Sequence, residues 1–205
     1  MFHCPTLTSL LIFATLFLAT PAFAAPRTHD GFFFRATTGL AYASTSETVT
    51  DTSFSISGLS TMTSLSAGWS IVNNLALHLD LAAVSMVNPK VAMTSGGTTL
   101  SKDIAAEETV VNIGVGATHY IMPQNVYVGG AFHLSQLSLR TNSKVTDSGT
   151  GWGLALNAGK EMWLSDNWGI GVAGQFLFSA VPDKGTSAST LYTPALGVLL
   201  SVTYN

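Results

Sequence analysis

Bulky apolar residues alternate with small or weakly polar ones through most of residues 151–179. One face of this stretch is formed by Trp152, Leu154, Leu156, Ala158, Trp168, Ile170, Val172, Phe176 and Phe178. A period of two indicates β-strands, and Ser-Asp-Asn at 165–167 predicts a hairpin turn between them. A water-soluble sheet carries charge on its outer face, whereas here the face opposite the bulky residues is small and almost uncharged. The pattern therefore favours a sheet whose apolar face contacts lipid and whose small face lines a narrow lumen.

The same alternation recurs from residue 32 to the end of the chain. It predicts six more strands, at 32–44, 59–72, 75–87, 109–121, 126–140 and 190–204. Strand 75–87 separates the two faces most clearly, because four leucines alternate with Ala76, His78, Asp80 and Ala82. In strand 126–140 the pattern shifts, because Leu137 and Leu139 have the parity of inward positions. We expect a β-bulge near Ser135 or Gln136, or emergence of the strand from the membrane.

Short and long connections alternate between the eight predicted strands. Three turns are short, near Asn73, Gln124 and Asp166, and four connections are longer. The Ser/Thr-rich segment 45–57 is expected to be a loop, and so is 88–107, where Lys102 to Glu108 could form one helical turn. Even strand number with alternating connections predicts an all-β fold, an eight-stranded antiparallel up-and-down transmembrane β-barrel with both termini on the periplasmic side.

Aromatic residues should mark the two membrane interfaces of such a barrel. The predicted girdle residues, which lie near the ends of the strands, are Tyr42, Trp69, Trp152, Trp163, Trp168, Tyr192 and Tyr204.

Composition supports a membrane barrel. Charged residues make up only 9% of the chain, against roughly 25% in an ordinary soluble domain. Mean hydropathy is +0.38, yet beyond the first residues there is no apolar run of the roughly 20 residues that a spanning helix needs. The net charge of −3 and the lack of a basic cluster argue against a nucleic-acid partner.

The first 24 residues have the pattern of a secretory signal peptide. An apolar core from Leu7 to Ala19 is followed by Pro21 and a small-x-small sequence that ends at Ala24. The alternative is a short membrane anchor. The expected organisation is a signal peptide at 1–24 and a barrel domain at 25–205. The single cysteine, Cys4, lies in the leader, so the mature chain has no disulfide and no cysteine metal site.

From the leader, the eight alternating strands, the asymmetric connections and the closing strand LYTPALGVLLSVTY, the chain resembles the small outer-membrane barrels of Gram-negative bacteria, the OmpX-like and OmpA-barrel-like class. The resemblance covers about residues 30–205 and implies a monomer in the lipopolysaccharide-containing outer membrane. It also implies that the barrel-assembly machinery reads the last strand, which here carries Asn205 after Tyr204. The extracellular ligand is left open.

Lumen positions carry the candidate chemistry. We predict a buried charge network of Arg35, Asp80 and Glu161 with His78 nearby, because an unpaired charge in a narrow lumen is very costly. Small inward residues leave room for Tyr120, Tyr127 and Met62 as fillers, so no open pore is expected.

Four further functional hypotheses are weighed against this one. His133 and Ser135 share a strand face. Lipid A deacylases resemble eight-stranded barrels and use such a His-x-Ser pair, but here Gln136 replaces the usual Asn and no orienting acid is evident on a neighbouring strand.

Residues 169–174 match the GxGxxG motif of dinucleotide-binding sites, but they lie inside a strand, so no cofactor is assigned. No histidine spacing resembles a zinc site. A secreted lipocalin-like barrel would need its apolar face inward. The sequence predicts neither a catalytic residue nor a metal.

Overall fold

The computed structural model describes residues 28–49, 52–142, 144–184 and 189–205. Eight strands form the barrel wall: β1 (Phe32–Val49), β2 (Thr52–Val72), β3 (Leu75–Val87), β6 (Ala106–Ile121), β7 (Val126–Thr141), β9 (Gly151–Trp163), β10 (Trp168–Pro182) and β11 (Thr190–Tyr204). Three shorter strands extend from it: β4 (Lys90–Ser95), β5 (Thr98–Asp103) and β8 (Lys144–Asp147). The predicted signal peptide at 1–24 lies outside the described residues.

The sheet closes on itself. The first strand, β1, pairs antiparallel with both β2 and β11, so Phe34 lies between Ala67 and Tyr204. The remaining neighbours follow in the order β11, β10, β9, β7, β6, β3 and β2. Closure gives every wall strand two partners, which removes the unpaired edge that hydrocarbon would not tolerate. The predicted eight-stranded up-and-down antiparallel barrel is therefore confirmed.

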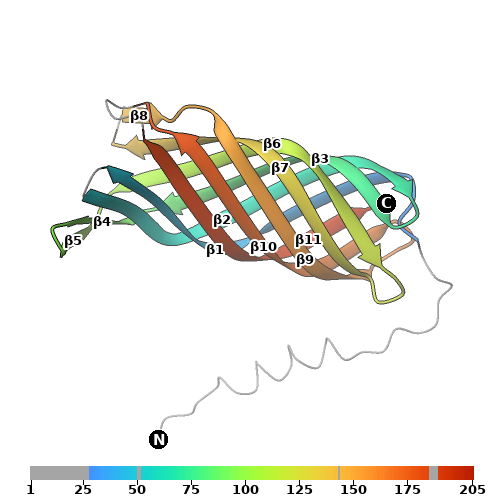
Figure 1. Ribbon diagram of the computed structural model, residues 1–205. Coiled ribbons are helices and arrows are strands. Elements are labelled where there is room, and N and C mark those ends of the chain that lie inside the picture. The colour runs from blue at the N-terminus through green and yellow to red at the C-terminus, as the bar shows by residue number, and fades with distance from the viewer. Residues whose placement is uncertain (1–27, 50–51, 143, 185–188) are drawn as a thin grey trace, which may run out of the picture.

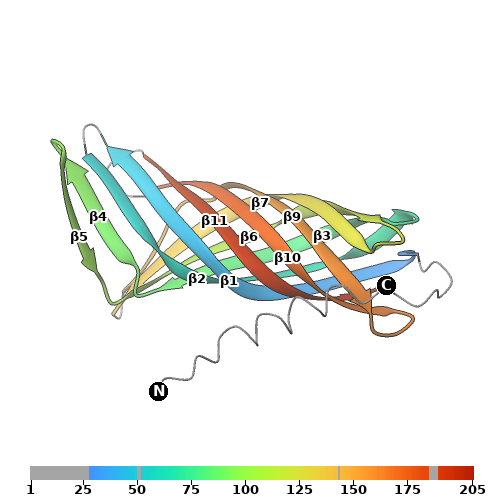
Figure 2. The ribbon, with the colours of Figure 1, turned by 90° about the horizontal axis from the view of Figure 1, so that it is seen from below.

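The two ends of the barrel differ (Figure 1). The C-terminus and the turns between β2 and β3, β6 and β7, and β9 and β10 lie at one end, here named the short-turn end. The β4–β5 hairpin (Figure 2) and β8 (Figure 1) lie at the opposite end, here named the extended end. Two short turns contain asparagines with a left-handed backbone, Asn74 (φ 68°) and Asn125 (φ 51°), a conformation that asparagine tolerates better than most residues.

Apolar side chains cover the outside of the wall. Leu79 is 68% exposed and Val198 is 71% exposed, whereas their neighbours His78 and Leu199 are buried. The predicted inward and outward faces of the strands are reproduced along all eight strands. A bilayer is the environment that matches such a surface. None of the described residues lies in a helix long and apolar enough to cross a membrane.

Aromatic rings gather near both ends of the strands. Near the short-turn end, Phe32 contacts Trp69 and Tyr204, and Tyr204 contacts Trp168, with ring centroids 5.1–6.3 Å apart. A second series runs from Phe132 through Trp152 and Phe178 to Tyr192. Trp163 differs from the other expected girdle residues, because its ring lies 4.8 Å from that of His29 at the mouth of the lumen.

Two segments expected to be loops are strands instead. The wall strands β1 and β2 extend over 45–49 and 52–57, where they pair with each other, and residues 90–103 form the β4–β5 hairpin, so the helical turn expected at 102–108 is wrong. Gly96 and Gly97 both have positive φ, as a type I′ turn requires. Hydroxyl pairs tie these strands together, including Thr94–Thr99 at 2.8 Å and Thr48–Ser53 at 3.1 Å. The Ser/Thr content that suggested solvated loops therefore reflects cross-strand hydrogen bonding.

The bulge expected near Ser135 or Gln136 is also absent from the pairing of β6 with β7. Val110, Val111 and Asn112 face Leu137, Gln136 and Ser135 in unbroken register. Leu137 keeps its inward parity and is 5% exposed, packing against Val110 and Val181. The apparent change of pattern arises because the lumen itself becomes apolar toward the extended end.

Candidate functional site

A chain of polar contacts crosses the middle of the lumen. Arg35 Nη2 donates to the Thr118 hydroxyl at 3.1 Å, and His78 Nε2 lies 3.1 Å from the same oxygen. His78 Nδ1 is 3.9 Å from Asp80 Oδ2. Thr118, which the sequence did not single out, thus bridges Arg35 and His78.

Asp80 has two closer partners. Ser66 donates to its Oδ2 at 2.6 Å, and His133 Nε2 lies 2.9 Å from its Oδ1. All three side chains are buried. The acid beside His133 comes from β3, two strands away rather than on a neighbouring strand, and it reaches His133 because only the glycine-rich strand β6 separates β3 from β7.

Arg35 makes no ion pair within 4.0 Å with Asp80 or Glu161 among the described residues. Its guanidinium lies 4.4 Å from the ring centre of Tyr127 and 5.5 Å from that of Phe33. A cation over an aromatic face gains electrostatic energy without a carboxylate. The described contacts thus place Arg35 among rings and one hydroxyl.

Glu161 forms a second polar group toward the short-turn end. Thr203 donates to its Oε1 at 2.6 Å, Ser201 does so at 3.4 Å, and the Tyr120 hydroxyl donates to Oε2 at 3.3 Å. A longer-range charge interaction between Glu161 and Arg35, within the predicted network, stays a prediction.

Beside this group, His29 closes the lumen mouth. Its ring stacks on Tyr120 with centroids 3.4 Å apart, and its Nε2 lies 2.8 Å from Asn125 Oδ1. Its backbone N–H donates to Asn74 Oδ1 at 3.0 Å. Although His29 precedes the first strand, only 1% of its surface is exposed, because the two turn asparagines and Tyr120 hold it. Burial lowers the pKa of His29 below its usual value.

Ser135 and His133, the nucleophile and the base of the deacylase hypothesis, have other hydrogen-bond partners. Ser135 donates its hydroxyl to Asn112 Oδ1 at 2.6 Å, and Ser179 donates to the same oxygen at 3.0 Å. His133 directs Nε2 at Asp80 instead. Both side chains face the lumen, with His133 0% and Ser135 1% exposed, so neither faces the surrounding lipid.

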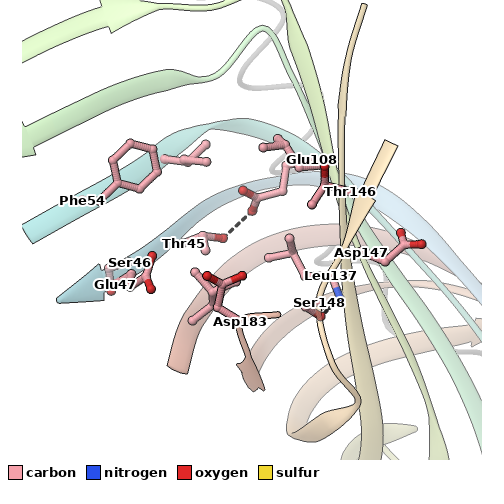
Figure 3. Close-up of a pocket in the computed structure, with 13 residues that line it drawn as sticks. Thr45, Ser46, Glu47, Phe54, Glu108, Leu137, Thr146, Asp147, Ser148 and Asp183 are labelled. Carbon is pink, nitrogen blue, oxygen red and sulfur yellow. Dashed lines mark hydrogen bonds between the residues drawn. The ribbon is translucent and has the colours of Figure 1, made fainter. Parts of the chain in front are cut away.

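A pocket of about 160 Å³ lies at the extended end (Figure 3). Strands β1, β2, β6, β7, β8 and β11 and the residue after β10 contribute its walls. Its carboxyl groups belong to Glu47, Glu108, Asp147 and Asp183. Its apolar walls come from Phe54, Ile56, Leu137, Leu139 and Leu191.

Glu108 is the most enclosed acid of this pocket, with 1% of its surface exposed. The Thr45 hydroxyl donates to its Oε1 (Figure 3), and Thr45 also lies 2.8 Å from the Thr193 hydroxyl. Its Oε2 is buried without a hydrogen-bond partner among the described residues. Glu108 shares the inward parity of Asn112, but it was not predicted as a lumen residue because 102–108 was expected to form a helical turn before the strand.

Two solved structures are similar to this chain. Neisserial surface protein A superposes with a TM-score of 0.57 and 17% identity, over 85% of this chain and 96% of that one. The outer membrane protein OprG from Pseudomonas aeruginosa superposes with a TM-score of 0.50 and 14% identity, over 86% and 96%. The chain has the fold of the small outer-membrane β-barrel proteins. No protein-family model and no curated protein matches the sequence.

Proposed function

We propose that this protein is a closed outer-membrane barrel of Gram-negative type, without catalysis, whose role is structural or lies in surface interaction through its extended end. The observation that carries the proposal is the side-chain packing of the lumen. Met62, Tyr120 and Tyr127 are 0–1% exposed, and polar contacts link side chains from opposite parts of the wall. An eight-stranded barrel has an interior just wide enough for side chains to fill.

The extended end is the part that would face the medium in the usual orientation of such barrels, with long connections outside the cell and short turns in the periplasm. The protein would be a monomer in a bilayer containing lipopolysaccharide, inserted by the barrel-assembly machinery. The predicted leader at 1–24 would direct it across the inner membrane.

A lipid A deacylase activity has less support than a closed, non-catalytic barrel. A deacylase must bring its serine to an ester of a membrane lipid, but Ser135 lies inside the wall and donates to Asn112. A lipocalin-like ligand site also has less support, because the leucine and valine faces point outward.

Conductance in planar bilayers tests closure. We expect the purified, folded protein to give no stable conductance steps. A variant with Met62, Tyr120 and Tyr127 changed to alanine provides the matched control, because it removes the largest fillers and should conduct. Heat-modifiable gel migration establishes that each protein is folded. Steady conductance by the unaltered protein would overturn closure.

Surface interaction is tested by comparing a deletion strain with strains that express the unaltered protein or a variant in which a short Gly-Ser link replaces residues 90–103. If the role is structural, the shortened variant should restore the outer-membrane permeability barrier of the deletion strain as fully as the unaltered protein does. If the role lies in surface interaction, the shortened variant should restore the barrier but should not restore binding at the cell surface.

A further inference from the structure

The pocket at the extended end contains a buried carboxylate, which a rim of solvent-exposed acids would not. Glu108 is enclosed, yet one carboxylate oxygen has no donor. A buried acceptor without a partner is destabilising, and more so when it is charged. The described lining residues supply three further carboxyl groups and no lysine or arginine. The unmet acceptor and the surrounding charge both favour a cation that donates hydrogen bonds.

Glu108 Oε2 differs from other carboxylate oxygens of the pocket, several of which accept a hydrogen bond from a hydroxyl group. Thr45 supplies the donor for Oε1, Ser189 donates to Glu47 Oε1, and Ser138 donates to Asp147 Oδ1 at 2.5 Å. Only for the Glu108 oxygen do burial and the lack of a donor coincide among the described pocket acids. An N–H from a ligand would form a charge-assisted hydrogen bond there.

The apolar walls restrict the rest of the ligand. Ile56 and Leu137 are each 5% exposed, and Leu139 and Leu191 lie near them. A bare metal ion or ammonium would leave these walls without contacts, whereas an aliphatic chain would cover them. The volume of about 160 Å³ is similar to that of a cavity of roughly 150 Å³ that accepts benzene, so a chain of a few carbons can enter.

We propose that this pocket binds a primary alkylammonium group, with the nitrogen donating to Glu108 Oε2 and the alkyl chain lying against Ile56, Leu137 and Leu191. Both free aliphatic amines and lysine side chains of a partner polypeptide carry this chemistry. The inference rests on the proposed role of the extended end in surface interaction.

Titration calorimetry of the full-length mature protein, folded in detergent micelles, tests the proposal with n-pentylammonium as the probe. We expect Glu108→Gln to weaken binding by about 10-fold to 100-fold, since a hydrogen bond to a charged group contributes about 1.5–3 kcal/mol. The matched control is Glu107→Gln, which changes the preceding residue on β6. Glu107 points to the opposite face and does not line the pocket, so affinity should stay within about two-fold.

A series of probes on the unaltered protein keeps the test independent of how any variant folds. Tetramethylammonium has no N–H, and we expect it to bind at least about 10-fold more weakly than n-pentylammonium. Magnesium should not compete at millimolar concentration. Equal binding of tetramethylammonium, effective competition by magnesium, or unchanged affinity in Glu108→Gln would each overturn the proposal.

Two outcomes identify the source of the group. Binding of n-pentylammonium that depends on Glu108 would support a free amine as a sufficient ligand. Binding of a Gly-Lys-Gly peptide with the same dependence, but not of n-pentylammonium, would support a lysine side chain. If neither binds while the barrel stays folded and non-conducting, the alkylammonium site fails and the proposal of a closed barrel stands.

Discussion

Asp80 and His133 meet across Gly114, with Asp80 Oδ1 2.9 Å from His133 Nε2. Both residues pair in register with Gly114, Asp80 from β3 and His133 from β7. Glycine has no side chain to separate the two groups, so residues two strands apart in the wall can form a hydrogen bond inside the lumen. This contact joins β3 to β7 in addition to the backbone ladders.

Removing Asp80 should destabilise the barrel. Asp80→Ala leaves His133 and Ser66 buried without their partner, which should lower the free energy of unfolding by about 3 kcal/mol. Urea unfolding in detergent micelles, followed by tryptophan fluorescence, measures the change. Asp103→Ala, at an exposed position in β5, is the control and should stay within about 0.5 kcal/mol of the unaltered protein. Equal stability of the two variants would show that the Asp80 contacts add nothing.

The sequence predicted which residues of this group face inward, but not which of them meet. Period-two alternation assigns a face to His78, Asp80 and His133 without reference to other strands. Their contacts depend on the register between β3, β6 and β7, which alternation leaves undetermined. Arg35 illustrates the consequence, because alternation predicted its inward face but not its contacts with Tyr127 and Thr118.

Ser135 should be dispensable for chemistry. Because its hydroxyl donates to Asn112 rather than to His133, Ser135→Ala should leave the acyl-chain content of lipid A unchanged when the protein is expressed in cells. The variant should lose about 1 kcal/mol of stability, since Asn112 keeps only the Ser179 donor. Mass spectrometry of lipid A is the measurement, with cells lacking the protein as the reference. An acyl chain removed by the unaltered protein but retained with Ser135→Ala would contradict the non-catalytic interpretation.

Gly116 should not accept a side chain. A Cβ there would lie 2.7 Å from His78 Cε1 and 2.7 Å from the Gly130 carbonyl oxygen. Gly116→Ala should therefore displace the His78 ring from Thr118 and lower stability by about 2 kcal/mol, as overpacking of a filled interior does. Urea midpoints of both proteins test this.

Gly174→Ala is the control for Gly116→Ala, since nothing lies within 4 Å of a Cβ at Gly174 on the outer face. We expect its stability to be within about 0.5 kcal/mol of that of the unaltered protein. A Gly116→Ala protein as stable as the Gly174→Ala protein would mean that the lumen at His78 is loosely packed.

The extended end was the least predictable part of the fold. Alternation there is carried by Ser and Thr, whose hydropathies differ little between the two faces, so residues 45–57 and 90–103 give a weak period-two signal. Their strands depend on cross-strand hydroxyl pairs and on the Gly96–Gly97 turn. The pocket was missed for the same reason, because it is built where these extensions meet the barrel wall.

Lowering the pH should weaken the closure at His29. Burial places the pKa of His29 below the 6.5 of a free imidazole, so between the two values the unfolded chain binds a proton that the folded chain does not. The stability from neutral His29 is therefore complete above pH 6.5 and is lost as the pH falls below it. At pH 5.5 the loss is at most about 1.4 kcal/mol, because this pH is one unit below the pKa of the imidazole in the unfolded chain.

The measurement is the change in unfolding free energy between pH 8 and pH 5.5 for three proteins. His29→Gln cannot bind the proton, so its free energy should fall by less than that of the unaltered protein. His119→Gln removes an exposed histidine on β6 and should retain the full dependence. His78 and His133 are present in all three proteins, so the difference between variants isolates His29. An identical fall in His29→Gln and the unaltered protein would show that His29 is as easily protonated in the barrel as in the unfolded chain.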